Sequence, residues 1–332
     1  MIKVHCFVSC VCEIIKKTPG VDHRPFYFGV WDADFSVTPQ QQLSYHSEHT
    51  QHTFFRNWYQ LLYGVDITPW YQPQQSKQDN IANLIKLLEN KPADRHIMVM
   101  LDMYQLPERE NKFNQNPFPH YVMLETTDDP DIWFMHDPDF RWEGPLAKDR
   151  VINAINQPTV AGGFYFDSLT IRHTESDTVE AYFRQCLKLQ QNPFTDALRN
   201  IVERHLYDTD FPLIRLGEAL REIPVMAIRK YAYEHAFAYF WEALSLDAAE
   251  FEYWCDQIES LVTGYTKLQY HCMKLAMTQQ THLAVAIAKL LDDQDQREFT
   301  IKHKLLQVFN QWTARDLMTV KNGSELATAE EI

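Results

Sequence analysis

Three residues whose side chains can together carry out acyl transfer are Cys6, His120 and Asp137. Cys6 stands where apolar residues begin to recur at helical spacing, and a thiol in the first turn of a helix is stabilised as a thiolate. His120 begins one apolar stretch, and Asp137 follows the end of the next. A thiolate beside an imidazole that a carboxylate orients is a nucleophilic site, so these residues predict a Cys-His-Asp triad.

The spacing of His120 and Asp137 is that of a two-stranded hairpin. Its arms, His120–Glu125 and Ile132–His136, are rich in residues that favour strands, and the segment between them has turn composition. If the turn is centred on Asp128 and Asp129, His120 lies opposite Asp137, with Cβ atoms about 4.5–5.5 Å apart. A slip of one residue would send the two side chains to opposite faces of the sheet, so the prediction depends on this register.

The cysteines near the N-terminus also allow other interpretations. Cysteines on an apolar helix are more often packing residues than nucleophiles, and we expect this role for Cys10 and Cys12. Together with His5 and Cys6 they form a string rich in metal ligands. Its spacing matches neither paired zinc knuckles nor the three-cysteine string that binds a radical iron–sulfur cluster, so we expect no metal.

Composition narrows the class of protein. The chain has 332 residues, of which 45% are hydrophobic and 13% aromatic, enough for one large core or two ordinary ones. Its net charge of −14 disfavours a nucleic-acid partner and favours small cations such as polyamines. The six cysteines do not suggest a disulfide framework, no apolar run is long enough to span a membrane, and no signal peptide is apparent. We therefore expect a cytoplasmic protein that has no membrane partner.

Local patterns predict two parts of different character. In the first part we expect a helix from Cys6 to about Pro19 and then an extended aromatic segment at Arg24–Phe28. We next expect two helices, Phe54–Tyr63 and Asn80–Glu89, and a strand, Ile97–Leu101, followed by the hairpin. From residue 176 nearly every segment has a helical pattern: Val179–Leu189, Thr195–His205, Leu213–Glu222, Val225–Leu244, Ala248–Met277 and His282–Trp312. We predict domains at 1–175 and 176–320, with a disordered polar tail at 321–332.

The triad residues occur in a familiar order. A cysteine that starts the first helix, His-Tyr-Val at the start of a strand and Asp-Pro at the end of the next resemble papain-like folds, bacteriocin-leader peptidases and the acyltransferase domain of butirosin biosynthesis protein H. This resemblance implies an α+β fold, with a papain-like domain built on an antiparallel sheet and followed by an all-helical domain. No glutamine precedes Cys6 at the distance usual in papain-like enzymes, so the side-chain oxyanion donor is unassigned.

Longer strings resemble the AsbE family of petrobactin biosynthesis proteins along nearly the whole chain. They are His5-Cys6, residues 28–35 (FGVWDADF), residues 106–113 (LPERENKF), Pro119-His120-Tyr121, residues 137–144 (DPDFRWEG) and residues 228–231 (IRKY). The resemblance implies condensation of a 3,4-dihydroxybenzoyl group, carried as a thioester on the phosphopantetheine of an aryl carrier protein, with a primary amine of spermidine. It implies no other cofactor.

Carboxylates and aromatic faces in or near these strings are candidates to bind the ammonium groups of spermidine. We expect the acids to be Asp32, Asp34, Asp139, Glu143 and Glu234. Arg229 and Tyr233 accompany Glu234 in a stretch that crowds polar groups among rings, and ordinary hydrogen bonds between helices would explain it equally well. We expect the amine to enter between the two domains, beside at least two of the segments 31–35, 139–143 and 231–242 and open to His120.

Two other functions use the same residues. A papain-like cysteine peptidase or amidase would release the acyl group to water, and a protein without catalysis would only bind a polyamine or a carrier. The acceptor nitrogen and the oligomeric state, a homodimer included, are left open by the sequence.

Overall fold

The computed structural model describes residues 4–46, 52–111 and 113–329, and the side chains up to Arg315. The fold is α+β, with an antiparallel sheet followed by a helical region. One sheet has the strand order β3-β8-β4-β5-β6-β7, and β1 pairs with β2 apart from it. The strands are β1 (Ser36–Val37), β2 (Leu43–Ser44), β3 (Thr68–Pro69), β4 (Arg95–Asp102), β5 (Pro119–Thr126), β6 (Ile132–Asp137), β7 (Trp142–Ala147) and β8 (Gly163–Asp167).

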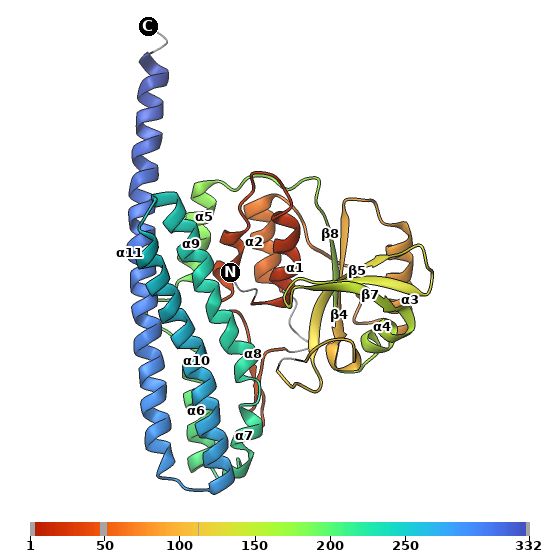
Figure 1. Cartoon of the computed structure of the whole chain (residues 1–332), viewed down its shortest axis with the longest axis vertical. Coiled ribbons are helices and arrows are strands. Elements are labelled where there is room, and N and C mark those ends of the chain that lie inside the picture. The colour runs from red at the N-terminus through yellow and green to blue at the C-terminus, as the bar shows by residue number, and fades with distance from the viewer. Residues whose placement is uncertain (1–3, 47–51, 112, 330–332) are drawn as a thin grey trace.

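The two faces of the large sheet belong to different cores because side chains alternate along each strand. Along β4, Ile97 and Val99 pack with α3 (Lys77–Asn90) and α4 (Lys148–Ile155). The intervening Met98 and Met100 pack toward α1 (Cys6–Ile15) and α2 (Thr53–Tyr63). In Figure 1, α1 and α2 therefore lie between the sheet and the long helices of the C-terminal region.

The C-terminal region is a bundle in which the two longest helices run side by side (Figure 1). Its elements are α5 (Ser176–Cys186), α6 (Pro193–Tyr207), η3 (Leu213–Arg215), α7 (Leu216–Ala219), α8 (Ile223–Ala227), η4 (Ile228–Tyr231), α9 (Ala232–Leu244), α10 (Ala248–Thr278) and α11 (Leu283–Ala329). One core runs from α1 into this bundle without a break. The helix α1 is therefore packed between two structured layers.

Several elements match the sequence-based predictions, among them α1, α2, α3, β4 and the two arms of the hairpin. Others are wrong. The segment Arg24–Phe28 is not extended but forms the 3-10 helix η1 (Arg24–Gly29), with Pro25 in its first turn. The single helix expected over Val225–Leu244 is divided, because the 3-10 segment η4 separates α8 from α9.

The register of the hairpin also differs from the predicted one. Met123 pairs with His136 and Thr126 with Trp133, so the turn is centred later than Asp128 and Asp129. The cause is local: the Thr127 hydroxyl donates to the carbonyl of Ile132 and accepts from the amide of Asp129, and both contacts draw the later residues into the turn. Each residue therefore lies opposite one that is two positions further along the other strand than predicted. A shift of two keeps His120 and Asp137 on the same face of the sheet, as diagonal neighbours.

Helix α11 is described through Ala329, so it includes most of the segment expected to be a disordered tail, and residues 330–332 lie outside the described part. The predicted domain boundary near residue 175 stays a prediction. Within the described residues, no helix has both the length and the apolar character needed to cross a membrane.

Candidate active site

The hairpin brings His120 and Asp137 together. His120 Nε2 lies 2.9 Å from Asp137 Oδ1, and both side chains are buried. Because a carboxylate only accepts hydrogen bonds, Nε2 carries the proton, which leaves Nδ1 for another partner. The Cys6 side chain lines the same cavity as His120 and interacts with the imidazole. Burial opposes protonation of His120, but Asp137 and then Cys6 offset this effect, so the pKa of His120 is well above its ordinary value.

Asp137 has a second cationic partner that the sequence did not indicate. Arg109 Nη2 donates to Asp137 Oδ2 at 2.7 Å, and the guanidinium lies over the ring of Trp142, 4.1 Å from its centre. Burial alone would raise the pKa of Asp137, but His120 and Arg109 together lower it below its ordinary value. The carboxylate is thus held ionised. Arg109 belongs to the string at residues 106–113, and this was the one available signal.

The first turn of α1 is held in place by Asp139 and by the N-cap residue His5. The backbone N–H of His5 donates to Asp139 Oδ1 at 3.0 Å, and the hydroxyl of Ser9 donates to the same oxygen at 2.7 Å. The His5 ring caps the helix by accepting from the N–H of Val8 at 3.5 Å. The start of a helix leaves its first N–H groups without intrahelical acceptors. Among the described residues, the N–H groups of Cys6 and Phe7 are the ones of this set that have no other hydrogen-bond partner. They are candidate donors to an oxyanion beside the thiol.

The other N-terminal cysteines face away from this site. Cys10 Sγ is 3.6 Å from the carbonyl oxygen of Tyr121, Cys12 Sγ is 3.7 Å from that of His23, and both residues are buried. Cys6, by contrast, is partly exposed and lines a cavity. The three thiols therefore do not converge on one point.

The cavity beside Cys6 has a volume of about 290 Å³ and is lined from both parts of the chain. Cys6, His120 and Asp139 come from α1, β5 and the turn between β6 and β7, whereas Gln185 and Arg229 come from the helical region. Two of the three segments expected beside an amine contribute, namely 31–35 and 139–143, but segment 231–242 does not. The cavity is therefore placed between the layers and open to His120, and its ligand stays a prediction.

One wall of the cavity is aromatic. Phe140 lies 5.0 Å from the ring of His120, and Phe118 lies 5.8 Å from it, measured between ring centres. Phe113 and Tyr45 pack against these rings and line the same cavity. Such a wall suits a flat aromatic group placed next to the imidazole.

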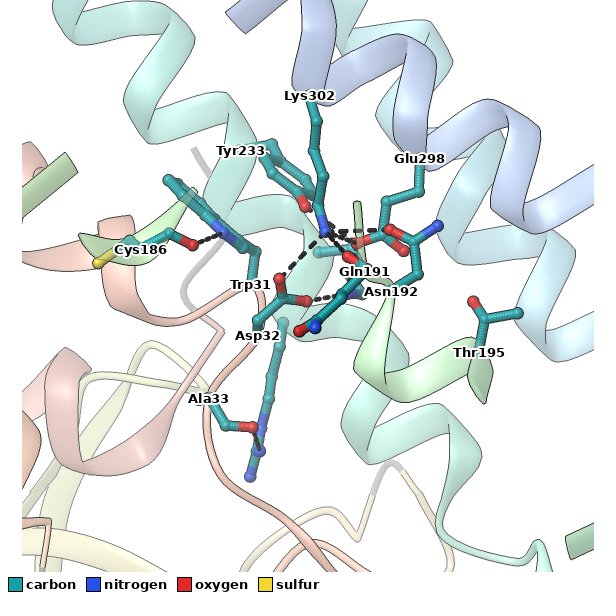
Figure 2. Close-up of polar contacts among 12 residues, drawn as sticks. Trp31, Asp32, Ala33, Cys186, Gln191, Asn192, Thr195, Tyr233, Glu298 and Lys302 are labelled. Atoms are coloured by element: carbon teal, nitrogen blue, oxygen red, sulfur yellow. Dashed lines mark hydrogen bonds and ion pairs between the residues drawn. The ribbon is translucent and has the colours of Figure 1, made fainter. Parts of the chain in front are cut away.

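Asp32, predicted to bind substrate, instead belongs to a buried ion cluster. Its carboxylate oxygens lie 2.8 Å from Lys230 Nζ and 3.1 Å from Lys302 Nζ. Lys230 also pairs with Glu298 at 2.6 Å, and Figure 2 shows how Lys302 reaches Asp32 from α11, the helix that also carries Glu298. A carboxylate with two lysine partners is not free for an ammonium group of spermidine. Asp32 attracts cations as expected, but the cations belong to the protein.

The remaining predicted residues are placed differently from one another. Tyr233 is fully buried, donates to Glu298 and stacks on Trp31, so it is a structural residue. Glu143 is exposed beside His136, and neither it nor Glu234 lines the cavity. Neighbouring positions in sequence point to different sides of a strand or helix, so these three side chains lie outside the cavity lining, and their role in binding the amine stays a prediction. Only the exposed Asp34 keeps a carboxylate without a hydrogen-bond or ion-pair partner among the described residues while lining the cavity.

Family models of known proteins match nearly the whole chain. Residues 1–171 match the family model described as the DUF6005 N-terminal domain, and residues 177–325 match the DUF6005 C-terminal domain. The chain is also 44% identical over 312 residues to a Bacillus anthracis protein named petrobactin synthase. That match covers 94% of this chain and 95% of the relative.

Proposed function

The chain belongs to the DUF6005 family, and we propose that it is an acyltransferase of petrobactin biosynthesis that works through an acyl-Cys6 intermediate. The name of the Bacillus anthracis relative supports the pathway. The proposed donor is a 3,4-dihydroxybenzoyl thioester on the phosphopantetheine of an aryl carrier protein. The proposed acceptor is a primary amine of spermidine.

One observation carries the reaction type: the His120 imidazole is hydrogen-bonded to the Asp137 carboxylate and lines the same cavity as the Cys6 thiol. The raised pKa of His120 favours an imidazolium at neutral pH, which pairs with a Cys6 thiolate. Asp137 and Arg109 fix the ring without removing its proton. This is the arrangement that nucleophilic acyl transfer by cysteine needs.

In the first half-reaction, the Cys6 thiolate attacks the thioester carbonyl, and the C=O π electrons move to oxygen. The N–H groups of Cys6 and Phe7 donate to this oxyanion. When the carbonyl re-forms, the bond to pantetheine sulfur breaks, and that sulfur takes the proton from His120. The products are an acyl-Cys6 thioester, a free pantetheine thiol and a neutral imidazole.

In the second half-reaction, the neutral imidazole accepts a proton from the amine. Spermidine amines have a pKa near the lysine value of about 10.4, so the attacking nitrogen arrives as an ammonium that must lose two protons to become an amide nitrogen, one to solvent before the attack and one to the imidazole. The amine nitrogen attacks the acyl-Cys6 carbonyl, and collapse of the intermediate expels the thiolate. The amide forms, and the Cys6–His120 pair returns to its starting state.

The lining of the cavity suits both substrates. The rings of Phe113, Phe118 and Phe140 offer a flat apolar surface for the aryl group beside His120. The exposed carboxylate of Asp34 can hold a second ammonium group of the polyamine at another side of the cavity. An acceptor that is bound and oriented competes with water for the acyl group.

The test is incubation with an aryl-loaded carrier protein and spermidine, followed by mass spectrometry of the small molecules. The proposal predicts the dihydroxybenzoyl amide of spermidine. Release of the free acid at the same rate with and without spermidine would instead identify a hydrolase. Binding of spermidine or carrier with no product would identify a binding protein.

A further inference from the structure

Arg229 is a buried cation that the helical region supplies to the cavity of Cys6. It lies in η4, is 6% exposed and lines the same cavity as Cys6 and His120. A 3-10 helix has about three residues per turn, so adjacent side chains point in well-separated directions. Arg229 accordingly faces the cavity, while the next residue, Lys230, faces the ion cluster of Asp32.

Among the residues that the structure describes, the guanidinium of Arg229 is held by backbone carbonyl groups alone. Nη1 donates to the oxygens of Ala33 at 3.4 Å and Asp34 at 3.0 Å, and Nη2 donates to that of Tyr45 at 3.2 Å. These contacts use three of the five N–H groups of the side chain. Among the described residues, no carboxylate forms an ion pair with it.

The contrast with the adjacent Lys230 shows what is unusual about Arg229. Lys230 is as deeply buried, but two carboxylates balance its charge. Burial of a cation without an anion is costly, and burial does lower the pKa of Arg229. Among the surrounding ionisable groups, Cys6 has the largest electrostatic effect on Arg229. Tyr45, Asp139 and Asp34 follow it in that order and line the same cavity, but Cys6 is the group among these four on which the proposed reaction develops a negative charge.

We propose that Arg229 stabilises the negative charge that the reaction places at Cys6, first on the thiolate and then on the oxygen of the tetrahedral intermediate. The inference deepens the proposed function and rests on it for the second of these charges. Arg229 then serves the purpose of the side-chain oxyanion donor that the sequence left unassigned. The helical region thereby completes an active site whose nucleophile, acid–base residue and carboxylate all precede residue 138.

The test measures the reactivity of the thiol without any acyl substrate. Cys6 is alkylated with neutral iodoacetamide and with anionic iodoacetate at pH 7, and the modified cysteine is identified by peptide mass spectrometry. The variants are Arg229→Gln, which keeps hydrogen-bonding capacity without charge, and Arg229→Lys, which keeps the charge. Lys188→Gln is the matched control, because Lys188 is an exposed cation that lines the same cavity.

In Arg229→Gln, alkylation of Cys6 by iodoacetamide should slow by about tenfold, which is the effect of one strong charge interaction on an ionisation equilibrium. The rate of alkylation by iodoacetate should fall further, because Arg229 also attracts this anionic reagent. Arg229→Lys should recover most of both rates, and Lys188→Gln should stay within about twofold of the wild type.

A folded Arg229→Gln protein whose Cys6 reacts at the wild-type rate would overturn the inference. Should that variant fail to fold, the wild type still decides: a Cys6 that iodoacetate modifies less readily than it modifies Cys255, which lies near Glu234 and Asp256, contradicts a cation at the thiol. If the wild-type protein transfers no acyl group from the carrier to spermidine, the proposed function is refuted, whereas the alkylation result is unaffected.

Discussion

The carboxylate of Asp137 binds two cations at once: Oδ1 is 2.9 Å from His120 Nε2, and Oδ2 is 2.7 Å from Arg109 Nη2. Asp137 has no exposed side-chain surface. A buried carboxylate of this kind is stable only while its partners are present. His120 is therefore oriented by a pair of residues rather than by one.

Arg109→Met should destabilise the fold by roughly 3–5 kcal/mol, because it leaves the buried Asp137 carboxylate with His120 as its one side-chain partner among the described residues, beside the N–H of Phe140. Chemical denaturation measures this change. Arg150→Met is the control: Arg150 forms an exposed ion pair with Glu108, so its loss should cost at most about 1 kcal/mol. Equal effects of the two substitutions would show that Arg109 is not a structural partner of Asp137.

Asp137→Asn should shift the pH dependence of Cys6 acylation to lower pH. In the wild type the pKa of His120 is raised, so the imidazolium that protonates the leaving thiol persists through neutrality and is lost as pH rises through that pKa. Without the carboxylate charge, the pKa should fall toward about 6.5 or below. Single-turnover acylation rates across pH measure the shift. If the acylation rate falls at the same high pH in Asp137→Asn as in the wild type, that fall reports the titration of a group other than His120.

Asp34→Asn should raise the Michaelis constant for spermidine several-fold and leave acylation by the carrier near normal, because the Asp34 carboxylate lines the cavity without a hydrogen-bond or ion-pair partner among the described residues. The penalty should shrink at high salt, since Asp34 is exposed. Glu143→Gln removes an equal charge outside the cavity and should have no such effect. Slower acylation in Asp34→Asn at an unchanged Michaelis constant would place the polyamine elsewhere.

Asp139→Ala should act on the first half-reaction, although Asp139 was predicted to bind the amine. Its Oδ1 accepts hydrogen bonds from the His5 amide and the Ser9 hydroxyl, so the substitution releases the start of the helix that carries Cys6. We expect a loss of about 1–3 kcal/mol in unfolding free energy. Acylation should slow more than the Michaelis constant for spermidine changes, and the reverse pattern would restore Asp139 to the amine site.

The residues of the proposed triad could be predicted because each lies at a boundary that local patterns mark. Cys6 stands at a helix start, and His120 and Asp137 stand at the ends of hairpin arms. The predicted register was wrong by two residues, yet the alternation of side chains kept both on one face. An error of one residue would have separated them.

Pairings between distant segments could not be predicted. Asp32 meets Lys302 only when α11 packs against the loop after η1, and nothing near Asp32 in sequence indicates this partner. Arg109 reaches Asp137 from a loop without regular structure, where no periodicity restricts the side chain. The division of the helix expected at Val225–Leu244 was equally hidden, and it determines which way Arg229 and Lys230 point.

The most direct test of the proposed mechanism is the intact mass of the protein after mixing with the aryl-loaded carrier, followed by peptide mapping. The mechanism predicts one dihydroxybenzoyl adduct on Cys6 that disappears as the spermidine amide forms. Cys6→Ala should abolish adduct and amide, whereas Cys10→Ala and Cys12→Ala should retain most of both. An adduct on Cys10, or amide formation at the wild-type rate in Cys6→Ala, would contradict it.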